Sequence, residues 1–363
     1  MKSERNLKKF GERKNEKNKL LLATAILATA LGTASLNQNV KAETAGVVSS
    51  GQLTIKKSIT NFNDDTLLMP KATFTFDVKP VDVTGEEKDT ASGLKIQKGI
   101  AGVASQTIQY DNTDKPTNKE KAVNFDFSTV TFPNVGVYRY EVSEQAGDVK
   151  GITYDSKKWT VDVYVVNENN KFTPKYIVSK ETTDSSKKPI VFNNELKTTS
   201  LTIKKEVTGN SGDKTSDFTF TLLLKENTQF ETGQKVKATK KKSGAEEETV
   251  EVTIGKQYTF TLKDSEELIL DKLPIGITYQ VDETDKNKEQ YETSAKMTED
   301  SKEAQGYTLN DLKTTDETAD TITVTNKRNL PIPTGVVGIL APFAVLSIVA
   351  IGGVIYITKR KKA

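Results

Sequence analysis

Two sets of polar side chains in this sequence carry the chemical groups needed to form an amide bond. Each set contains an amine, a carboxyl group and a carboxamide, in that order along the chain. The sets are Lys57, Glu144 and Asn194, followed by Lys205, Glu283 and Asn326. Side chains on a β-strand alternate between its two faces, so residues two apart share a face. Each of the six residues shares a face with apolar neighbours, which predicts that all six point into a core.

The alternation can be followed in the short segments that carry these residues. The segments are LTIKKSI (53–59), YEVSE (140–144) and IVFNN (190–194), then LTIKKEV (201–207), YQVDE (279–283) and ITVTN (322–326). The adjacent Lys56 and Lys204 fall on the outward face, so Lys57 and Lys205 are the predicted core lysines. For any single residue, a strand end could let the side chain reach water. The recurrence of the same three residue types in the same order favours burial.

Burial would make these groups reactive towards one another. An unpaired charge inside a sandwich core is very unfavourable, so the lysine and the glutamate must pair or become neutral. Desolvation lowers the pKa of a lysine and raises the pKa of a carboxyl group. A neutral amine can attack the Asn carboxamide, while a protonated Glu hydrogen-bonds the carbonyl oxygen and shuttles protons as ammonia leaves. The expected product is one Lys–Asn amide bond in each domain, formed once and without an enzyme.

The elements that must position these groups are β-strands throughout. Alternating runs rich in Thr, Val, Ile, Phe and Tyr are separated by clusters of Gly, Asn, Asp and Lys. This pattern is typical of β-sandwiches rather than of alternating strands and helices. The Lys, Glu and Asn segments repeat in the same order, which indicates an internal repeat. The sequence therefore predicts an all-β protein with two homologous domains, residues 43–197 and 198–329, joined by a linker of a few residues.

The N-terminal residues have the pattern of a secretory signal peptide. Residues 1–19 are rich in Lys and Arg, and an apolar run too short to span a bilayer follows at 20–34. Val40-Lys41-Ala42 then supplies small residues at the cleavage positions. This order predicts a signal peptide over residues 1–42 and a secreted mature chain that begins at Glu43.

The C-terminal residues 330–363 have the pattern of a sortase sorting signal. The motif Pro331-Ile332-Pro333-Thr334-Gly335 precedes an apolar span of bilayer length (336–357), which is followed by four basic residues. A sortase thiol would attack the carbonyl of Thr334, release Gly335 onward and pass the acyl group to an amine. The chain would then cross the membrane through 336–357 only transiently, before sorting. A single-pass membrane protein is the alternative interpretation.

Composition excludes several classes of function. The chain has 363 residues, no Cys and no His, which removes Cys and His nucleophile–base pairs and the usual zinc ligands. The absence of a glycine-rich phosphate loop and of a regular calcium loop leads us to expect no metal and no cofactor. Without 1–42 and the residues after Gly335, 39 basic and 46 acidic side chains remain. This net charge of −7 does not favour nucleic acid as a partner.

The chain is therefore not expected to be an enzyme. A wall-attached enzyme of the Ser–Lys or paired-carboxylate type remains an alternative, because those side chains are present. In a secreted chain without disulfides, stability must come from the core or from another crosslink. The six inward polar residues are better explained as components of such a crosslink than as a catalytic site.

The LTxxK, YxVxE and FxN elements resemble those of the CnaB-type immunoglobulin-like domains of Gram-positive surface proteins. From the signal peptide to the basic tail, the whole chain is similar to the streptococcal T-antigen major pilins. The resemblance implies two tandem immunoglobulin-like β-sandwiches, each with an intramolecular isopeptide bond. The implied bonds are Lys57–Asn194, promoted by Glu144, and Lys205–Asn326, promoted by Glu283.

The same resemblance implies covalent polymerisation into the backbone of an extracellular pilus. A pilin sortase would join Thr334 of one subunit to a surface lysine of the next, and a wall-anchoring sortase would attach the fibre to the cell wall. The matching position lies in the segment Ser186-Lys187-Lys188-Pro189-Ile190. Lys187 has outward parity, whereas Lys188 is in register with the inward residues of the following strand. Lys187 is therefore the predicted acceptor and Lys188 the runner-up.

The partners implied are identical subunits, the two sortases, ancillary pilins and a host surface, in support of adhesion and colonisation. A monomeric wall-anchored adhesin or an ancillary pilin is the alternative, which would use Thr334 for attachment but never Lys187 as an acceptor. The sorting motif also departs from the resemblance. In T-antigen pilins the five residues are closer to Glu or Gln, Val, Pro, Thr and Gly. Here Pro331 and Ile332 occupy the first two positions, which leaves the cleavage chemistry intact but the cognate sortase unassigned.

Overall fold

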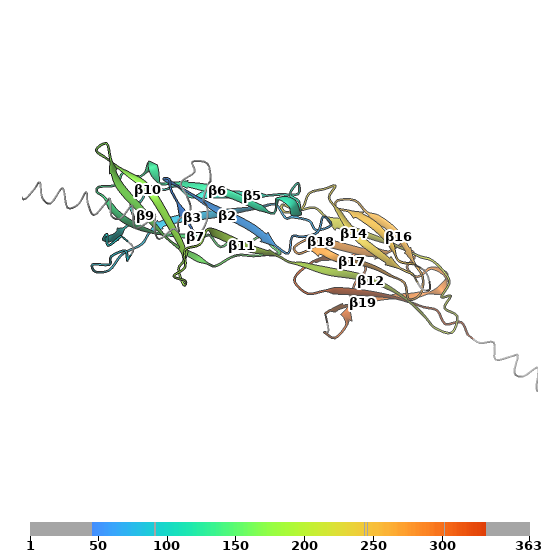
Figure 1. Ribbon diagram of the computed structural model, residues 1–363. Coiled ribbons are helices and arrows are strands. Elements are labelled where there is room, and N and C mark those ends of the chain that lie inside the picture. The colour runs from blue at the N-terminus through green and yellow to red at the C-terminus, as the bar shows by residue number, and fades with distance from the viewer. Residues whose placement is uncertain (1–45, 91, 243, 245, 301, 332–363) are drawn as a thin grey trace, which may run out of the picture.

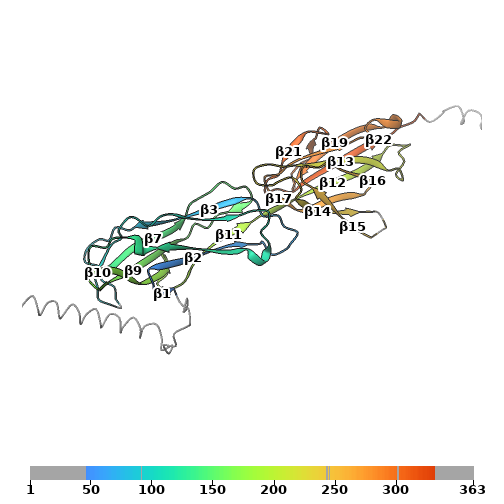
Figure 2. The same cartoon turned by 90° about the horizontal axis from the view of Figure 1, so that it is seen from above.

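The computed structural model describes residues 46–331, apart from residues 91, 243, 245 and 301. These residues form two β-sandwiches that lie end to end in an elongated molecule (Figure 1, Figure 2). The prediction of an all-β protein is confirmed. The predicted signal peptide (1–42), the sorting residues Thr334 and Gly335 and the apolar span (336–357) lie outside the described residues.

In the first sandwich, the described residues form a seven-stranded sheet that faces a four-stranded sheet. The larger sheet has the strand order β1 (Val47–Val48), β10 (Lys171–Glu181), β9 (Lys158–Glu168), β7 (Gly136–Glu144), β3 (Ala72–Pro80) and β5 (Gln106–Tyr110), with β4 (Ile96–Lys98) beside β7. The smaller sheet has the order β6 (Glu120–Asp126), β2 (Gln52–Thr60), β11 (Ile190–Leu196) and β8 (Ile152–Thr153). Their inner faces bury one apolar core, which includes Phe74, Phe76 and Phe192.

The described residues of the second sandwich again form a seven-stranded and a four-stranded sheet. The larger sheet has the order β15 (Glu248–Thr253), β14 (Lys235–Lys241), β17 (Glu267–Pro274), β12 (Thr198–Thr208), β22 (Asp320–Lys327), β19 (Glu292–Glu299) and β20 (Gln305–Gly306). The smaller sheet has the order β16 (Tyr258–Leu262), β13 (Phe218–Lys225), β18 (Thr278–Glu283) and β21 (Leu312–Thr314). A separate apolar core, which includes Phe220, Leu222 and Tyr279, fills the space between them.

Helical structure in the described part of the chain is limited to three single turns. These 3-10 turns are η1 (Pro116–Asn118), η2 (Phe127–Thr129) and η3 (Lys288–Gln290). Within residues 46–331, apart from the four undescribed positions, no helix is long and apolar enough to cross a membrane.

Each sandwich places its first long strand directly beside its last strand, and the two run parallel. β11 pairs with β2, with Phe192 opposite Lys57, and β22 pairs with β12, with Val324 opposite Lys205. Parallel neighbours cannot be joined by a tight hairpin and need a long crossover connection. In both sandwiches the intervening strands of the domain form that connection, so residues far apart in the sequence become neighbours.

A single residue separates the strands at the joint between the sandwiches, because β11 ends at Leu196 and β12 begins at Thr198. Contacts across the joint include an ion pair of 2.6 Å between Lys272 and Asp64. Gly151, at φ +76°, lies so close to the second sandwich that an added Cβ would sit 3.2 Å from the Cβ of Ile275. Because the joint lies between residues 43–197 and 198–329, we retain these ranges as the proposed domains.

Candidate functional site

The structure buries the side chains of all six residues that the sequence singles out. Their side chains are 0 % exposed: Lys57, Glu144 and Asn194 in the first core, and Lys205, Glu283 and Asn326 in the second. The prediction that these residues point into the cores is confirmed. In each sandwich the lysine and the asparagine come from neighbouring parallel strands of one sheet, and the glutamate ends a strand of the facing sheet.

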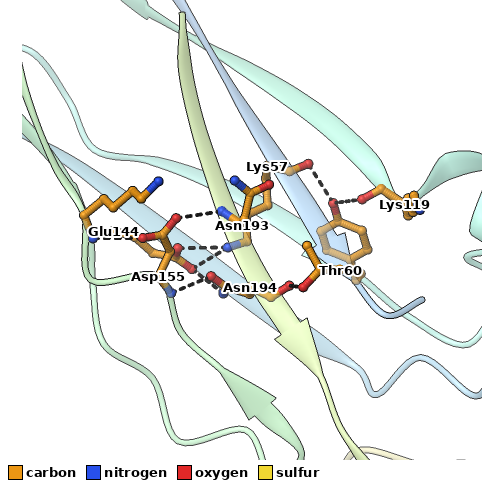
Figure 3. A network of polar contacts seen from close by, with 9 residues as sticks. Lys57, Thr60, Lys119, Glu144, Asp155, Asn193 and Asn194 are labelled. Atoms are coloured by element: carbon orange, nitrogen blue, oxygen red, sulfur yellow. Dashed lines mark hydrogen bonds and ion pairs between the residues drawn. The ribbon is translucent and has the colours of Figure 1, made fainter. Parts of the chain in front are cut away.

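In the first sandwich the carboxylate of Glu144 bridges the amine and the carboxamide (Figure 3). Lys57 Nζ lies 2.8 Å from Glu144 Oε2 and 3.0 Å from Oε1. Asn194 Nδ2 donates to Glu144 Oε1 at 2.7 Å. The carbonyl oxygen of the same carboxamide, Asn194 Oδ1, accepts a hydrogen bond of 2.7 Å from the backbone N–H of Asp155. Both ends of the carboxamide are therefore held.

The second sandwich repeats the bridge but leaves the carbonyl oxygen without a donor. Lys205 Nζ lies 2.9 Å from Glu283 Oε2, and Asn326 Nδ2 donates to Glu283 Oε1 at 2.6 Å. No hydrogen-bond donor among the described residues reaches Asn326 Oδ1, which is buried. The two sites thus share three side chains and differ at the oxygen of the asparagine.

Strand register explains why the amine and the carboxamide meet in both domains. Asn194 lies opposite Ile59, two residues beyond Lys57 on the same strand. Asn326 lies opposite Val207, again two residues beyond Lys205. Two residues along a strand is one step on the same face, so the long lysine side chain needs to reach only one step to meet its neighbour. The same offset occurs in both sandwiches, so the repeated sequence segments adopt the same strand register.

Burial is the main influence on the ionisation of these groups. It lowers the pKa of Lys57 from its ordinary value to about 8, although the charge of Glu144 opposes the shift. Burial also lowers the pKa of Lys205 and raises the pKa of Glu144. Each of these shifts favours the uncharged form of the group concerned. The environment thus increases the share of free amine and of carboxylic acid in the first core.

Aromatic rings enclose the amines. Lys57 Nζ lies 4.6 Å from the ring centroid of Phe74, and Lys205 Nζ lies 4.2 Å from that of Phe218. Phe74 has no exposed surface and Phe218 is 5 % exposed. These rings form walls that keep water from the amine, and a dry site strengthens the electrostatic interactions inside it. The sequence identified the polar triads but not these enclosing aromatic residues.

The geometry supports attack of a lysine amine on the neighbouring carboxamide, with one correction to the sequence-based scheme. That scheme placed a protonated glutamate on the carbonyl oxygen. In the first core Glu144 contacts the amine and Asn194 Nδ2, while the oxygen is held by Asp155. Glu144 is therefore positioned to move a proton from the attacking amine to the leaving nitrogen. Asp155 was missed because it lies in a turn and has no counterpart in the sequence repeat.

The predicted acceptor Lys187 and its neighbour Lys188 lie in the connection between β10 and β11, which is bound to β10. The backbone of Lys187 forms an isolated antiparallel β-bridge with that of Lys180. The backbone N–H of Lys188 donates a hydrogen bond to the carbonyl oxygen of Ser179, and the carbonyl oxygen of Lys188 accepts one from the Ser179 hydroxyl. Lys188 Nζ lies 2.5 Å from Asp184, and this hydrogen bond raises the pKa of Lys188. Among the described residues, no ion pair involves the amine of Lys187.

The parity argument that distinguished these two lysines was wrong for Lys188. We expected Lys188 to follow the inward residues of the next strand, but its side chain is 47 % exposed, and Lys187 is half-buried. The reason is that β11 begins only at Ile190, after Pro189. Strand alternation does not extend backwards into a turn. The ion pair with Asp184 now distinguishes Lys188 from Lys187, whose amine forms none among the described residues.

A metal centre has no support in the described part of the chain, where no group of three or more acidic side chains is arranged to hold an ion. The site therefore consists of the two buried triads and the partly exposed segment of residues 184–189. The sorting residues Thr334 and Gly335 lie outside the described range, so their geometry is not part of the site.

Comparison with known proteins gives matches over nearly the whole chain. A family model described as a Spy0128-like isopeptide containing domain matches residues 53–197, and a domain of unknown function matches residues 199–328. A curated pilin of Streptococcus pyogenes serotype M1 is 36% identical over 351 residues, which cover 95% of this chain and 98% of that protein.

Solved structures agree with the sequence relatives. The major pilin protein T3.2 of Streptococcus pyogenes is 50% identical, with a TM-score of 0.74, over 78% of this chain and 100% of that one. The major pilin protein T-13 of the same species is 47% identical, with a TM-score of 0.68 and the same two coverages. A shorter match of 135 residues, at 34% identity, is to a pilus tip adhesin, Cpa, of Streptococcus pyogenes and covers 18% of that protein.

The lowered pKa of Lys57 leads to a prediction about stability and pH. In an Asn194→Ala variant the lysine stays buried beside Glu144 but has no carboxamide to contact. The folded chain then binds the proton of Lys57 less tightly (pKa about 8) than the unfolded chain (10.5). The free energy of unfolding should therefore increase as the pH is raised from about 8 to about 10.5. Below pH 8 the lysine is protonated in both states, so its ionisation should no longer change the free energy of unfolding.

Urea unfolding at a series of pH values measures this dependence. The matched control is the double variant Lys57→Met, Asn194→Ala, which also lacks the carboxamide of Asn194 but has no buried amine. The difference between the two curves isolates Lys57 from the other lysines and tyrosines that titrate at high pH. Parallel curves would contradict the predicted shift of the Lys57 pKa.

Proposed function

This chain belongs to the streptococcal major pilin family and is a backbone subunit of a pilus, and on that basis we propose that self-generated amide bonds crosslink its two domains. The proposed bonds join Lys57 to Asn194 and Lys205 to Asn326, with Glu144 and Glu283 as the promoting groups. The members of the family are structural proteins and not enzymes. The crosslinking is accordingly a single reaction within each domain.

The observation that carries the proposal is the carboxylate bridge inside each core. A glutamate contacts both the lysine amine and the asparagine amide within 3.0 Å, in a site from which water is excluded. Attack of the amine on the amide carbon forms the new bond, and the displaced nitrogen leaves as ammonia once it has gained a proton. A bound carboxyl group that contacts both nitrogens can relay this proton from the amine. Positioning of this kind replaces the encounter of free reactants in solution.

Such bonds would stabilise the fold chiefly through the unfolded state. Each bond closes a loop of more than 100 residues, because it joins the first long strand of a domain to the last. By analogy with a disulfide that closes a loop of this size, each bond would contribute about 5 kcal/mol. The chain has no Cys, so no disulfide supplies this restraint.

Intact mass spectrometry of a mature chain, residues 43–334, tests the bonds. We expect a deficit of two ammonia masses, and digestion should give linked peptides that hold Lys57 to Asn194 and Lys205 to Asn326. Glu144→Ala should restore one ammonia and Glu283→Ala the other, because each glutamate serves only its own core. A wild-type mass equal to that of the plain sequence would overturn the proposal.

We further propose that subunits join from Thr334 of one chain to Lys187 of the next, through a pilin sortase. Lys187 is supported over Lys188 because its amine carries no ion pair among the described residues, whereas Lys188 pairs with Asp184. An amine must lose its proton to act as a nucleophile, and the pKa of Lys188 is raised by that pairing. A wall-anchoring sortase would then attach the finished extracellular fibre to the cell wall. Ancillary pilins and a host surface complete the proposed set of partners.

Conservative variants of the two lysines test the acceptor. Lys187→Arg keeps the charge but removes the nucleophilic amine, so we expect loss of the ladder of covalent species on a denaturing gel of wall extracts. Lys188→Arg is the matched control and should keep the ladder. The reverse result would assign the acceptor to Lys188, and a ladder in both variants would exclude both lysines as the sole acceptor.

The proposed linkage defines a path for tension through the subunit. Force applied at Lys187 runs along β11, through Lys197 and into β12. From Lys205 the bond would pass the load directly to Asn326, near the end of β22, and so to Thr334. The strands between Lys205 and Asn326 then carry no load. The first sandwich upstream of Lys187 also lies off the path.

The two crosslinks should therefore differ in mechanical effect. Because the chain has no Cys, Lys187→Cys and a cysteine placed after Thr334 give two unique attachment points for single-molecule pulling. Asn326→Ala removes the second bond and retains the Lys205–Glu283 pair, and we expect it to release about 400 Å of chain on unfolding. Asn194→Ala is the matched control and should extend no more than the wild type. Equal extension in both variants would contradict this load path.

A further inference from the structure

We propose that the backbone N–H of Asp155 is an oxyanion donor for the reaction between Lys57 and Asn194, and that the second domain reacts without such a donor. The proposal rests on the amide bonds proposed above and adds a group that assists one of them. Its basis is a difference between the two buried sites, namely the environment of the asparagine carbonyl oxygen.

The geometry at Asn194 fits the role of an oxyanion donor. The N–H of Asp155 donates to Asn194 Oδ1 at 2.7 Å, whereas Glu144 contacts the other polar atom of the carboxamide, Nδ2 (Figure 3). Because Glu144 accepts from Nδ2 at the same time, the carboxamide cannot rotate without losing both bonds. The oxygen that gains negative charge during the reaction is thus already bound by a dipole pointed at it. Fixed backbone donors of this kind are a main source of transition-state stabilisation in acyl transfer.

The side chain of Asp155 fixes the position of this N–H. One carboxylate oxygen accepts from the backbone N–H of Asn193 at 2.8 Å, and the other accepts from the N–H of Lys157 at 2.9 Å. Asp155 therefore fastens its own turn to β11 immediately beside Asn194. The side chain positions the turn, and the main chain of the same residue contacts the reacting carbonyl.

The difference between the domains comes from how the edge of the last strand is paired. In the first domain β8 pairs only Thr153 with Glu195 and Ile152 with Leu196, and the chain then leaves the ladder. Asp155 is consequently free to turn its N–H towards the Asn194 side chain. In the second domain β19 pairs along the whole of β22, with Thr293 directly opposite Asn326. A continuous ladder has no turn at this level, and within the described residues Asn326 Oδ1 has no donor.

The Lys57 Nζ lone pair forms a bond to Cγ of Asn194, and the carbonyl π electrons move to Oδ1, where the Asp155 N–H stabilises the negative charge. Glu144 takes a proton from Nζ and delivers a proton to Nδ2. The electrons on Oδ1 then reform the carbonyl, the Cγ–Nδ2 bond breaks, and ammonia leaves. No oxidant, metal or other reactant is needed.

The test replaces the N–H of Asp155 and leaves its carboxylate in place. In cell-free synthesis of the 43–334 chain, the α-hydroxy acid analogue of aspartate at position 155 puts an ester oxygen where the N–H was. Synthesis is stopped, samples are quenched in acid at intervals, and linked and unlinked peptides are quantified for both domains. We expect the Lys57–Asn194 bond to form about 100-fold more slowly, while the Lys205–Asn326 bond in the same molecules keeps its rate.

Two substitutions separate the N–H from the carboxylate. Asp155→Asn keeps the N–H and one of the two oxygen acceptors but removes the negative charge, and should slow the first bond much less than the ester does. Asp155→Pro removes the N–H by a second route and should be as slow as the ester. To show that slow variants still fold, each change is combined with Glu144→Ala, which blocks the bond, and thermal unfolding is compared with Glu144→Ala alone.

The outcomes are distinct. An unchanged rate of the first bond in the ester variant overturns the role of Asp155, although the bonds themselves would stand. Equal slowing in Asp155→Asn and in the ester would show that disturbance of the turn alone accounts for the effect, without a separate contribution of the N–H, and would likewise overturn the donor role. Absence of the first bond from the wild type would instead refute the proposed function. Slowing of the second bond together with the first would indicate a general folding defect and contradict the specific role.

Discussion

The parallel pairing of the first and last long strands is the constraint on which both buried sites depend. It brings Lys57 beside Asn194 and Lys205 beside Asn326, although more than 100 residues separate each pair in the sequence. It also means that each domain is closed by contacts between its two ends rather than by hairpins alone. The facing sheet supplies the glutamate. Without this pairing the three groups of each triad would have no reason to meet, and each would be an unfavourable buried polar residue.

The buried triads also show how a fold can tolerate charged groups in its core. A buried ion pair has a desolvation cost that its attraction often fails to offset. Here the cost is reduced because each glutamate accepts hydrogen bonds from two side chains, and because an aromatic ring covers the lysine. Conversion of the amine and the carboxamide to an amide, as proposed above, would remove the ionisable amine from each core.

Much of this site could be predicted from the sequence, because it follows from strand alternation and from the repeat. The inward direction of Lys57, Glu144 and Asn194 needs only the period of two along a strand. The same rule failed at Lys188, because β11 begins only at Ile190, after Pro189, and Lys188 therefore lies outside the strand. Asp155 could not be predicted, because its contact with Asn194 depends on where β8 leaves the sheet. That is a property of pairing between distant segments and leaves no periodic signal in the chain.

The position of each asparagine on the final strand has a consequence for the order of events during export. A chain that leaves the cell from its N-terminus presents the lysine first and the asparagine last. The sheet that holds the triad is incomplete until the last strand has emerged and inserted. Each proposed bond could then form only in a domain that has been translocated in full, and truncated or stalled chains would stay open. After closure the domain could no longer be threaded as a single extended chain through a narrow pore, so the reaction would make export of that domain a one-way process.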